Sequence, residues 1–192
     1  IVQFSSNSFR STTAEESAQQ QAQTVTSQIN DYVMNTKDAV CYFVEDQMVS
    51  NDQNYEDVTP GATNDLDAVE RKKILLYDKE GATIKETRIE WNKTNQTLFV
   101  DLDTADSKPA VLLAKNVNDF SMDLKDAFTH KKIELQIRIV NDKKTYGVDR
   151  KTINLRNQLL INQTPVSEGS GEFTKTITGT KVTASANRLL PS

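Results

Sequence analysis

The fold of this chain is decided by residues 13–44, TAEESAQQQAQTVTSQINDYVMNTKDAVCYFV. Their apolar side chains recur at steps of three and four residues, which is the spacing of one stripe along an α-helix. Thr13 followed by Glu16 has the pattern of a capping box, and the segment contains neither Gly nor Pro. We therefore predict one helix over 13–44, about 48 Å long. Its stripe comprises Ala18, Ala22, Val25, Ile29, Tyr32, Val33, Val40 and Phe43.

A heptad coiled coil is the alternative for a helix of this length. The stripe begins with small residues and continues with larger ones, without Leu at regular positions. This composition favours a single helix that lies across a sheet. The sheet is expected to cover only little of the alanine-rich N-terminal half of the helix.

From Arg71 onward the apolar period changes to two, which indicates β-strands. Strands are predicted at 74–77, 83–91 and 98–100, with turns at 79–82 and 92–96. Core candidates in this region are Ile84, Ile89 and Trp91. The segment 110–117 follows Pro109 and is predicted as a short helix or a crossing segment.

The most regular strand pattern lies between residues 133 and 139. Ile133, Leu135, Ile137 and Ile139 alternate with Glu134, Gln136 and Arg138. A partner strand is predicted from Tyr146 to Leu155. We expect the apolar set to face the helix and the polar set to face water, as in an antiparallel sheet covered on one side.

These elements predict an α+β fold, in which a long N-terminal helix packs on an antiparallel sheet. The domain is expected to span 1–157, with the rod helix at 13–44 and the sheet at 71–157. Residues 45–70 are predicted as a long polar loop with a helical turn at 65–69. Residues 158–192, rich in Thr, Ser and Gly, are predicted as a loose tail with one hairpin around 173–182. We also expect residues 25–157 to fold without the first 24.

Composition excludes several classes of function. The net charge is −4 and the pI about 5.1, so no general attraction to nucleic acid is expected. The sequence contains no run of 18 apolar residues that could span a membrane. Because the chain opens at Ile1 without an initiator Met, we expect that it has been cut, by processing or by design.

The reactive residue types are few. Cys41 is the only cysteine, so no internal disulfide can form, and we interpret it as a buried inert thiol. The alternative is a nucleophile, which would require a histidine partner, and the only histidine is His130 in a polar turn. Phosphate-binding loops and Cys/His metal spacings do not occur. We therefore predict no catalytic residue, no cofactor site and no metal site, and a protein that is not an enzyme.

Three weaker site hypotheses remain. Asp101, Asp103 and Asp106 resemble a calcium-binding run, but the EF-hand glycine and distal Glu are missing. Tyr77 and Trp91 are either a sugar-stacking surface or, as we prefer, core and cross-strand packing. Glycosylation sequons begin at Asn92, Asn95 and Asn162.

Three short motifs carry a family resemblance. Residues 112–120, LLAKNVNDF, resemble a run found in minor pilin-like proteins of Gram-positive bacteria. Residues 153–157, INLRN, resemble the end of the last strand in those proteins, and 88–91, RIEW, followed by Leu98 and Phe99, resemble their central hairpin. Over 12–157 the chain is similar to the J-type minor pseudopilins of type II secretion and to their relatives in type IV pili.

This resemblance implies a pilin-like fold and a structural role. The chain would be an assembly subunit, a minor pilin or pseudopilin, of a type IV pilus or type II secretion-like filament. Its partners would be other pilin subunits, bound through the N-terminal helix. A preceding membrane helix, absent from this sequence, would anchor it before assembly into an extracellular filament at the cell surface. The alternative is a cell-surface binding module for carbohydrate or another adhesive ligand.

Overall fold

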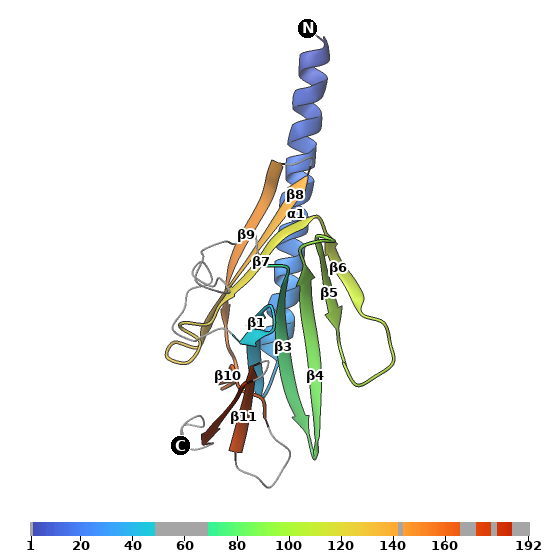
Figure 1. Cartoon of the computed structure of the whole chain (residues 1–192). Coiled ribbons are helices and arrows are strands. Elements are labelled where there is room, and N and C mark those ends of the chain that lie inside the picture. The colour runs from blue at the N-terminus through green and yellow to red at the C-terminus, as the bar shows by residue number, and fades with distance from the viewer. Residues whose placement is uncertain (1, 49–68, 142–143, 166–171, 178–179, 186–192) are drawn as a thin grey trace.

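The computed structural model describes residues 2–48, 69–141, 144–165, 172–177 and 180–185 of the chain. Among them, one helix, α1 (Val2–Asn35), packs on antiparallel sheets, so the fold is α+β as predicted. The N-terminal end of α1 extends well beyond the sheets, and its C-terminal half lies against them (Figure 1). Of the loop predicted at 45–70, the structure describes only the two ends, where residues 47–48 form a short strand; the helical turn predicted at 65–69 lies outside the described residues except for Val69.

The largest sheet has seven strands in the order β10-β1-β3-β4-β5-β6, with β2 attached to β1. Its pairs are antiparallel except for β1 with β10, which is parallel. The strands are β1 (Ala39–Val44), β2 (Gln47–Met48), β3 (Arg71–Glu80), β4 (Thr83–Asn92), β5 (Thr97–Asp101), β6 (Val111–Lys115) and β10 (Leu160–Ile161).

A second sheet has three antiparallel strands in the order β7-β8-β9. These are β7 (Val117–Asp123), β8 (Lys132–Asn141) and β9 (Lys144–Asn154), and α1 packs on β8 and β9. A separate hairpin joins β11 (Glu172–Ile177) to β12 (Thr180–Ser185), where the sequence predicted one.

The predicted helix was correct in its middle and wrong at its C-terminal end. Ala18, Ala22, Val25, Ile29 and Val33 are buried along one stripe of α1 and join the main core. The helix stops at Asn35, and Ala39–Val44 form β1, whose six residues are all buried. A run of apolar and β-branched residues that is buried on both faces favours an interior strand over a helix. Phe43 therefore joins a second cluster with Cys41 and Tyr77 rather than the helical stripe.

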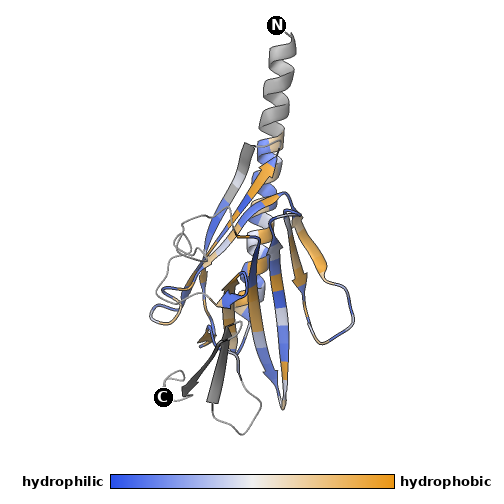
Figure 2. Ribbon diagram, viewed as in Figure 1, coloured by the Kyte–Doolittle hydropathy of each residue, from blue (hydrophilic) through white to orange (hydrophobic). Residues whose placement is uncertain are grey.

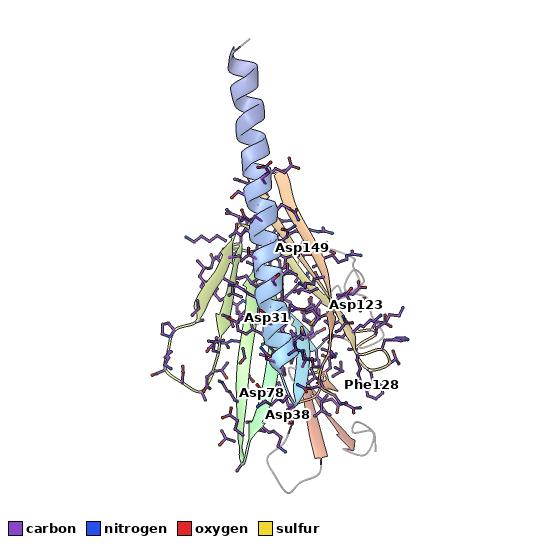
Figure 3. All side chains as sticks on the ribbon, turned by 180° about the vertical axis from the view of Figure 1, so that it is seen from behind. Asp31, Asp38, Asp78, Asp123, Phe128 and Asp149 are labelled. Atoms are coloured by element: carbon purple, nitrogen blue, oxygen red, sulfur yellow. The ribbon has the colours of Figure 1, made fainter. Side chains whose placement is uncertain are left out.

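Two aspartates fix the end of the helix. The backbone N–H of Lys37 donates to Asp78 Oδ1 at 2.6 Å, and the N–H of Lys79 donates to Asp38 Oδ2 at 2.6 Å. Asp38 and Asp78 lie together below the last turn of α1 (Figure 3). This reciprocal pair joins the segment after the helix to β3 and turns the chain into β1.

The helix also begins earlier than the capping box indicated. It starts at Val2, so Thr13 is an interior residue and not the first cap. At about 1.5 Å per residue, its 34 residues form a rod of about 51 Å.

The segment after Pro109 forms strands, and the short-helix alternative for it was wrong. β6 is the outer strand of the seven-stranded sheet and is largely apolar (Figure 2). Asn116 then adopts a left-handed conformation with φ of 58°, a region that Asn tolerates better than most residues. The chain turns there from the large sheet into β7 of the small one.

The alternation along β8 was confirmed on its apolar face. Ile133, Leu135, Ile137 and Ile139 are at most 1% exposed and join the core that includes α1. On the polar face Arg138 is exposed, but Gln136 is buried, contrary to the prediction. Its side-chain oxygen accepts a hydrogen bond from Arg150 at 3.0 Å, which accounts for a buried amide.

The chain remains part of the domain beyond the predicted boundary at 157. Leu159, Leu160 and Ile161 are buried, and β10 extends the large sheet. Asn162 Oδ1 accepts a hydrogen bond from the Tyr42 backbone N–H at 3.0 Å. At the other end, Ala18 and Ala22 also belong to the core, although they lie outside the fragment 25–157 that the sequence predicts to fold alone.

Candidate functional site

Two features of the described residues are candidates for function: the surface of the α1 rod and a buried charged cluster between the sheets. The rod packs on β8 and β9, and it comes especially close to β9 at Gly147. A Cβ placed on Gly147 would lie 2.5 Å from the carbonyl oxygen of Ala18, so only glycine fits there. The small side chains of Ala18 and Ala22 allow the strand to come this near the helix.

The exposed side of the rod is polar and rich in amides. An open groove of about 420 Å³ runs between α1 and β6. Its walls are Gln20, Gln21, Thr24 and Gln28 from α1, with Leu113 from β6. Side chains of this kind form hydrogen bonds with a partner but offer little apolar area for association in solution.

The buried cluster centres on Lys72 of β3. Its ammonium lies 2.6 Å from Asp119 Oδ1 and 3.0 Å from Ser121 Oγ, both on β7. The Lys72 side chain is only 5% exposed and that of Asp119 is 25% exposed. Ser121 Oγ in turn donates to Asp119 Oδ2 at 3.0 Å. These contacts join the seven-stranded sheet to the three-stranded one.

Aromatic residues surround this ion pair. The Lys72 ammonium lies 5.4 Å from the centre of the Trp91 ring, within range of a cation–π interaction. The Trp91 Nε1–H donates to the carbonyl of Val117 at 2.8 Å, next to the corner between the sheets. Burial raises the pKa of the Tyr42 phenol above its ordinary value of 10.0, and the negative charge of Asp119 raises it further.

A cavity of about 230 Å³ opens beside the cluster. Its described walls include three cations, Lys72, Lys93 and Arg138, and the amide of Asn118. Asp119 is the single acidic side chain among the described residues that line it, while Trp91 and Val69 supply apolar surface. The lining is therefore positive in a chain whose net charge is −4.

The residues considered for nucleophilic chemistry lie in different environments. Cys41 is buried in the second apolar cluster, among Phe43, Leu75 and Tyr77. His130 is exposed in the turn before β8, where its Nδ1 lies 3.3 Å from Asp126 Oδ1. The buried thiol therefore has apolar neighbours, as the inert interpretation predicted.

The aspartates considered for calcium stabilise their own loop. Asp101 Oδ1 accepts from the Asp103 N–H, and Asp103 Oδ1 accepts from the Ala105 N–H. Asp106 Oδ1 accepts from the Lys108 N–H, and its other oxygen pairs with the Lys108 ammonium. Within the described part of the chain, no three His, Cys, Asp or Glu residues are grouped to hold a metal ion.

The two aromatic residues considered for sugar stacking lie apart. Trp91 belongs to the main core, whereas Tyr77 belongs to the second cluster on the other face of β3. Both are less than 9% exposed, so they form no shared surface. Among the sequons, Asn162 is buried, whereas Asn95 lies exposed in the turn between β4 and β5.

Sequence reasoning missed both Gly147 and the Lys72 cluster. An isolated glycine within a strand is a signal for close backbone approach, and Gly147 stands alone between Tyr146 and Val148. Lys72 stands between Arg71 and Lys73 in a run of three basic residues, and its partner Asp119 is 47 positions away. Such a distant pair leaves no local pattern.

Comparison with known proteins gives no relative: no family model, curated protein or solved structure matches this chain. Among the described residues, no helix is both long and apolar enough to cross a membrane.

Proposed function

We propose that this chain is a structural subunit of a surface filament, a minor pilin or pseudopilin of the type IV pilus or type II secretion kind. The observation that carries the proposal is the shape of α1. Its C-terminal half is built into the core from Ala18 to Val33, while its N-terminal part projects beyond both sheets (Figure 1). A helix that needed only to stabilise the domain would not extend so far past it.

The positions of the family-like motifs support this proposal. Residues 112–120 form the corner from β6 to β7, next to the rod, and residues 88–91 lie in β4. The motif at 153–157 closes β9, the strand that α1 covers. All three motifs therefore shape the sheets on which the rod rests, as a filament subunit would require.

Under this proposal, the partners are sister subunits that bind along the rod. The protein would be held at the membrane before assembly and would then reside in an extracellular filament. No residue of the chain is assigned a catalytic role. The alternative, a carbohydrate-binding module, has less support because Trp91 and Tyr77 point to opposite faces of the large sheet.

Cell fractionation and immunogold microscopy test the proposal. Antibodies raised against the folded domain should label surface filaments, and the chain should appear in filaments sheared from cells. A chain found only in the cytosol, or one free in the medium without filaments, would contradict it.

A further inference from the structure

We propose that a groove on the outer face of β4 and β5 binds one residue of an uncharged saccharide. The groove measures about 220 Å³, several times the roughly 30 Å³ that one water occupies in the liquid, so it accommodates a single sugar ring. Trp91 and Leu98, on the same two strands, are buried in the core on the other face of the sheet. The groove is therefore separate from the cavity beside Lys72, and the inference does not depend on the filament role.

The walls of the groove come from two paired strands. They include three cross-strand pairs, Arg88 with Asp101, Glu90 with Phe99, and Asn92 with Thr97. Residues that lie directly opposite each other, and residues two positions apart on one strand, share a face of the sheet. Asn95 from the turn between the strands and Ala110 complete the described lining.

Phe99 gives the groove an apolar surface at its middle pair. Its side chain is half-buried, so part of the ring stays open to a ligand. A phenyl ring is flat and apolar, and the C–H face of a pyranose can lie against it. Leu112, the partner of Phe99 on β6, is 39% exposed and continues the apolar strip. Binding sites for small molecules combine such a surface with a few polar groups that fix the orientation of the ligand.

The polar groups around Phe99 retain donors and acceptors that the described part of the chain does not use. Asn92 Oδ1 accepts from the Asn95 N–H, which leaves the Asn92 amide N–H₂ as a donor. The side-chain amide of Asn95 has no partner among the described residues. Glu90 approaches Arg88 through Oε2 alone, so its Oε1 can accept. Sugar hydroxyls donate and accept at once, and they can therefore pair with the carboxylate and with both amides.

The charges in the wall favour an uncharged ligand. The Arg88 guanidinium lies between two carboxylates, with Nε 3.7 Å from Glu90 Oε2 and Nη2 3.5 Å from Asp101 Oδ2. An anion in the groove would meet both carboxylates, and a cation would compete with the guanidinium for them. A polyhydroxyl ring is subject to neither effect.

NMR titration of the ¹⁵N-labelled protein tests the site. The probes are methyl α-glucoside, methyl β-galactoside and N-acetylglucosamine, and glycerol at equal concentration is the control for a polyol without a ring. At least one sugar should shift the Asn95 side-chain amide and the Phe99 backbone signals saturably, with a Kd on the order of millimolar for a single ring. Glycerol should give no saturable shift.

Variants make the assignment specific. Asn95→Ala removes an exposed amide from the groove and should weaken binding about fivefold, since a hydrogen bond is lost. Phe99→Leu keeps an apolar side chain without the ring and should also weaken binding. Asn118→Ala removes an exposed amide that does not line the groove and should leave binding unchanged. Melting temperatures report whether each variant is folded. The proposal is overturned if no sugar gives a saturable shift, if glycerol gives the same shifts, or if Asn95→Ala binds as tightly as the wild type.

Discussion

Gly147 of β9 lies so close to Ala18 of α1 that any side chain at position 147 would strike the helix backbone. A Cβ there would lie 2.5 Å from the Ala18 carbonyl oxygen and 2.7 Å from its carbonyl carbon. Backbone atoms cannot rotate out of the way as a flexible side chain can. The close contact between α1 and the three-stranded sheet at this point therefore requires glycine at position 147.

Gly147→Ala should accordingly destabilise the domain. Forcing an extra methyl into a packed contact costs typically about 1–3 kcal/mol, because the helix or the strand must shift. Urea unfolding followed by circular dichroism measures the loss. Thr152→Ala, at an exposed position of the same strand, is the matched control and should change stability by less than about 0.5 kcal/mol. Equal stability of Gly147→Ala and wild type would show that β9 does not closely contact the helix at Ala18.

Ile29 tests the rest of the helical stripe. It is completely buried, so Ile29→Asp places an unpaired carboxylate in the core and should cost several kcal/mol. Ser27→Asp adds the same charge at an exposed position of α1 and should have little effect. Thermal melts of the two variants give the comparison, and an unchanged melting temperature for Ile29→Asp would reject the packing of the helix.

The Lys72–Asp119 pair should show strong coupling. Asp119→Ala leaves the buried ammonium without its carboxylate and should cost about 3 kcal/mol, whereas replacing both partners removes the unpaired charge. The double variant Lys72→Met/Asp119→Ala should therefore recover much of the lost stability. A double-mutant cycle from urea unfolding measures this, and simple additivity of the two single changes would contradict the pairing.

Stability should fall at alkaline pH. Burial raises the pKa values of Tyr42 and Tyr77 above 10.0, with the carboxylates of Asp119 and Glu86 respectively adding to the effect. In the unfolded chain these phenols lose their protons near pH 10, whereas in the folded protein they keep them. The unfolded state then binds fewer protons, so the free energy of unfolding is unaffected below pH 10 and decreases above it. The decrease should reach about 1.4 kcal/mol per pH unit for each tyrosine.

Unfolding curves between pH 8 and pH 11.5 check this pH dependence. The contribution of the Tyr42 phenol is isolated by the variant Tyr42→Phe. That variant should show a shallower decrease with pH, whatever its stability at pH 8. An identical slope in Tyr42→Phe and wild type would mean that the Tyr42 phenol titrates normally in the folded protein.

Calcium should have little effect on the melting temperature. The carboxylates of Asp101, Asp103 and Asp106 already accept backbone hydrogen bonds within their own loop. A ligand that bound only the folded state would raise the melting temperature. Scanning fluorimetry in calcium and in chelator makes the comparison, and a rise of several degrees in calcium would restore the Asp101–Asp106 loop as a metal site.

The sequence predicted those elements in which one period dominates. Ile133 to Ile139 alternate without interruption, and the structure buries each member of that apolar set. Ala39–Val44 could not be assigned in this way, because Val40 and Phe43 also fit the helical spacing of the preceding stripe. The deciding factor was tertiary: β1 is paired on both sides, with β3 and β10, and is buried throughout.

The charged cluster could not be predicted for a different reason. Lys72 follows Arg71 and precedes Lys73, so it reads as part of an exposed basic run. Its burial depends on β7 reaching the large sheet after the turn at Asn116, which brings Asp119 and Ser121 to it. These contacts form because the chain passes from one sheet to another, and the local spacing of apolar residues does not reveal such a passage.

The central claim is that the projecting part of α1 mediates assembly with sister subunits, and truncation tests it most directly. Deleting residues 1–13 removes the N-terminal part of the rod and keeps the core residue Ala18, so the domain should remain folded. Full-length and truncated chains, each co-expressed with the neighbouring pilin genes, are compared by affinity pull-down, with circular dichroism as the folding control. We predict that the full chain co-purifies with sister subunits and that the folded truncated chain does not. Equal recovery of the sister subunits with both chains would contradict the claim and would place recognition in the sheets.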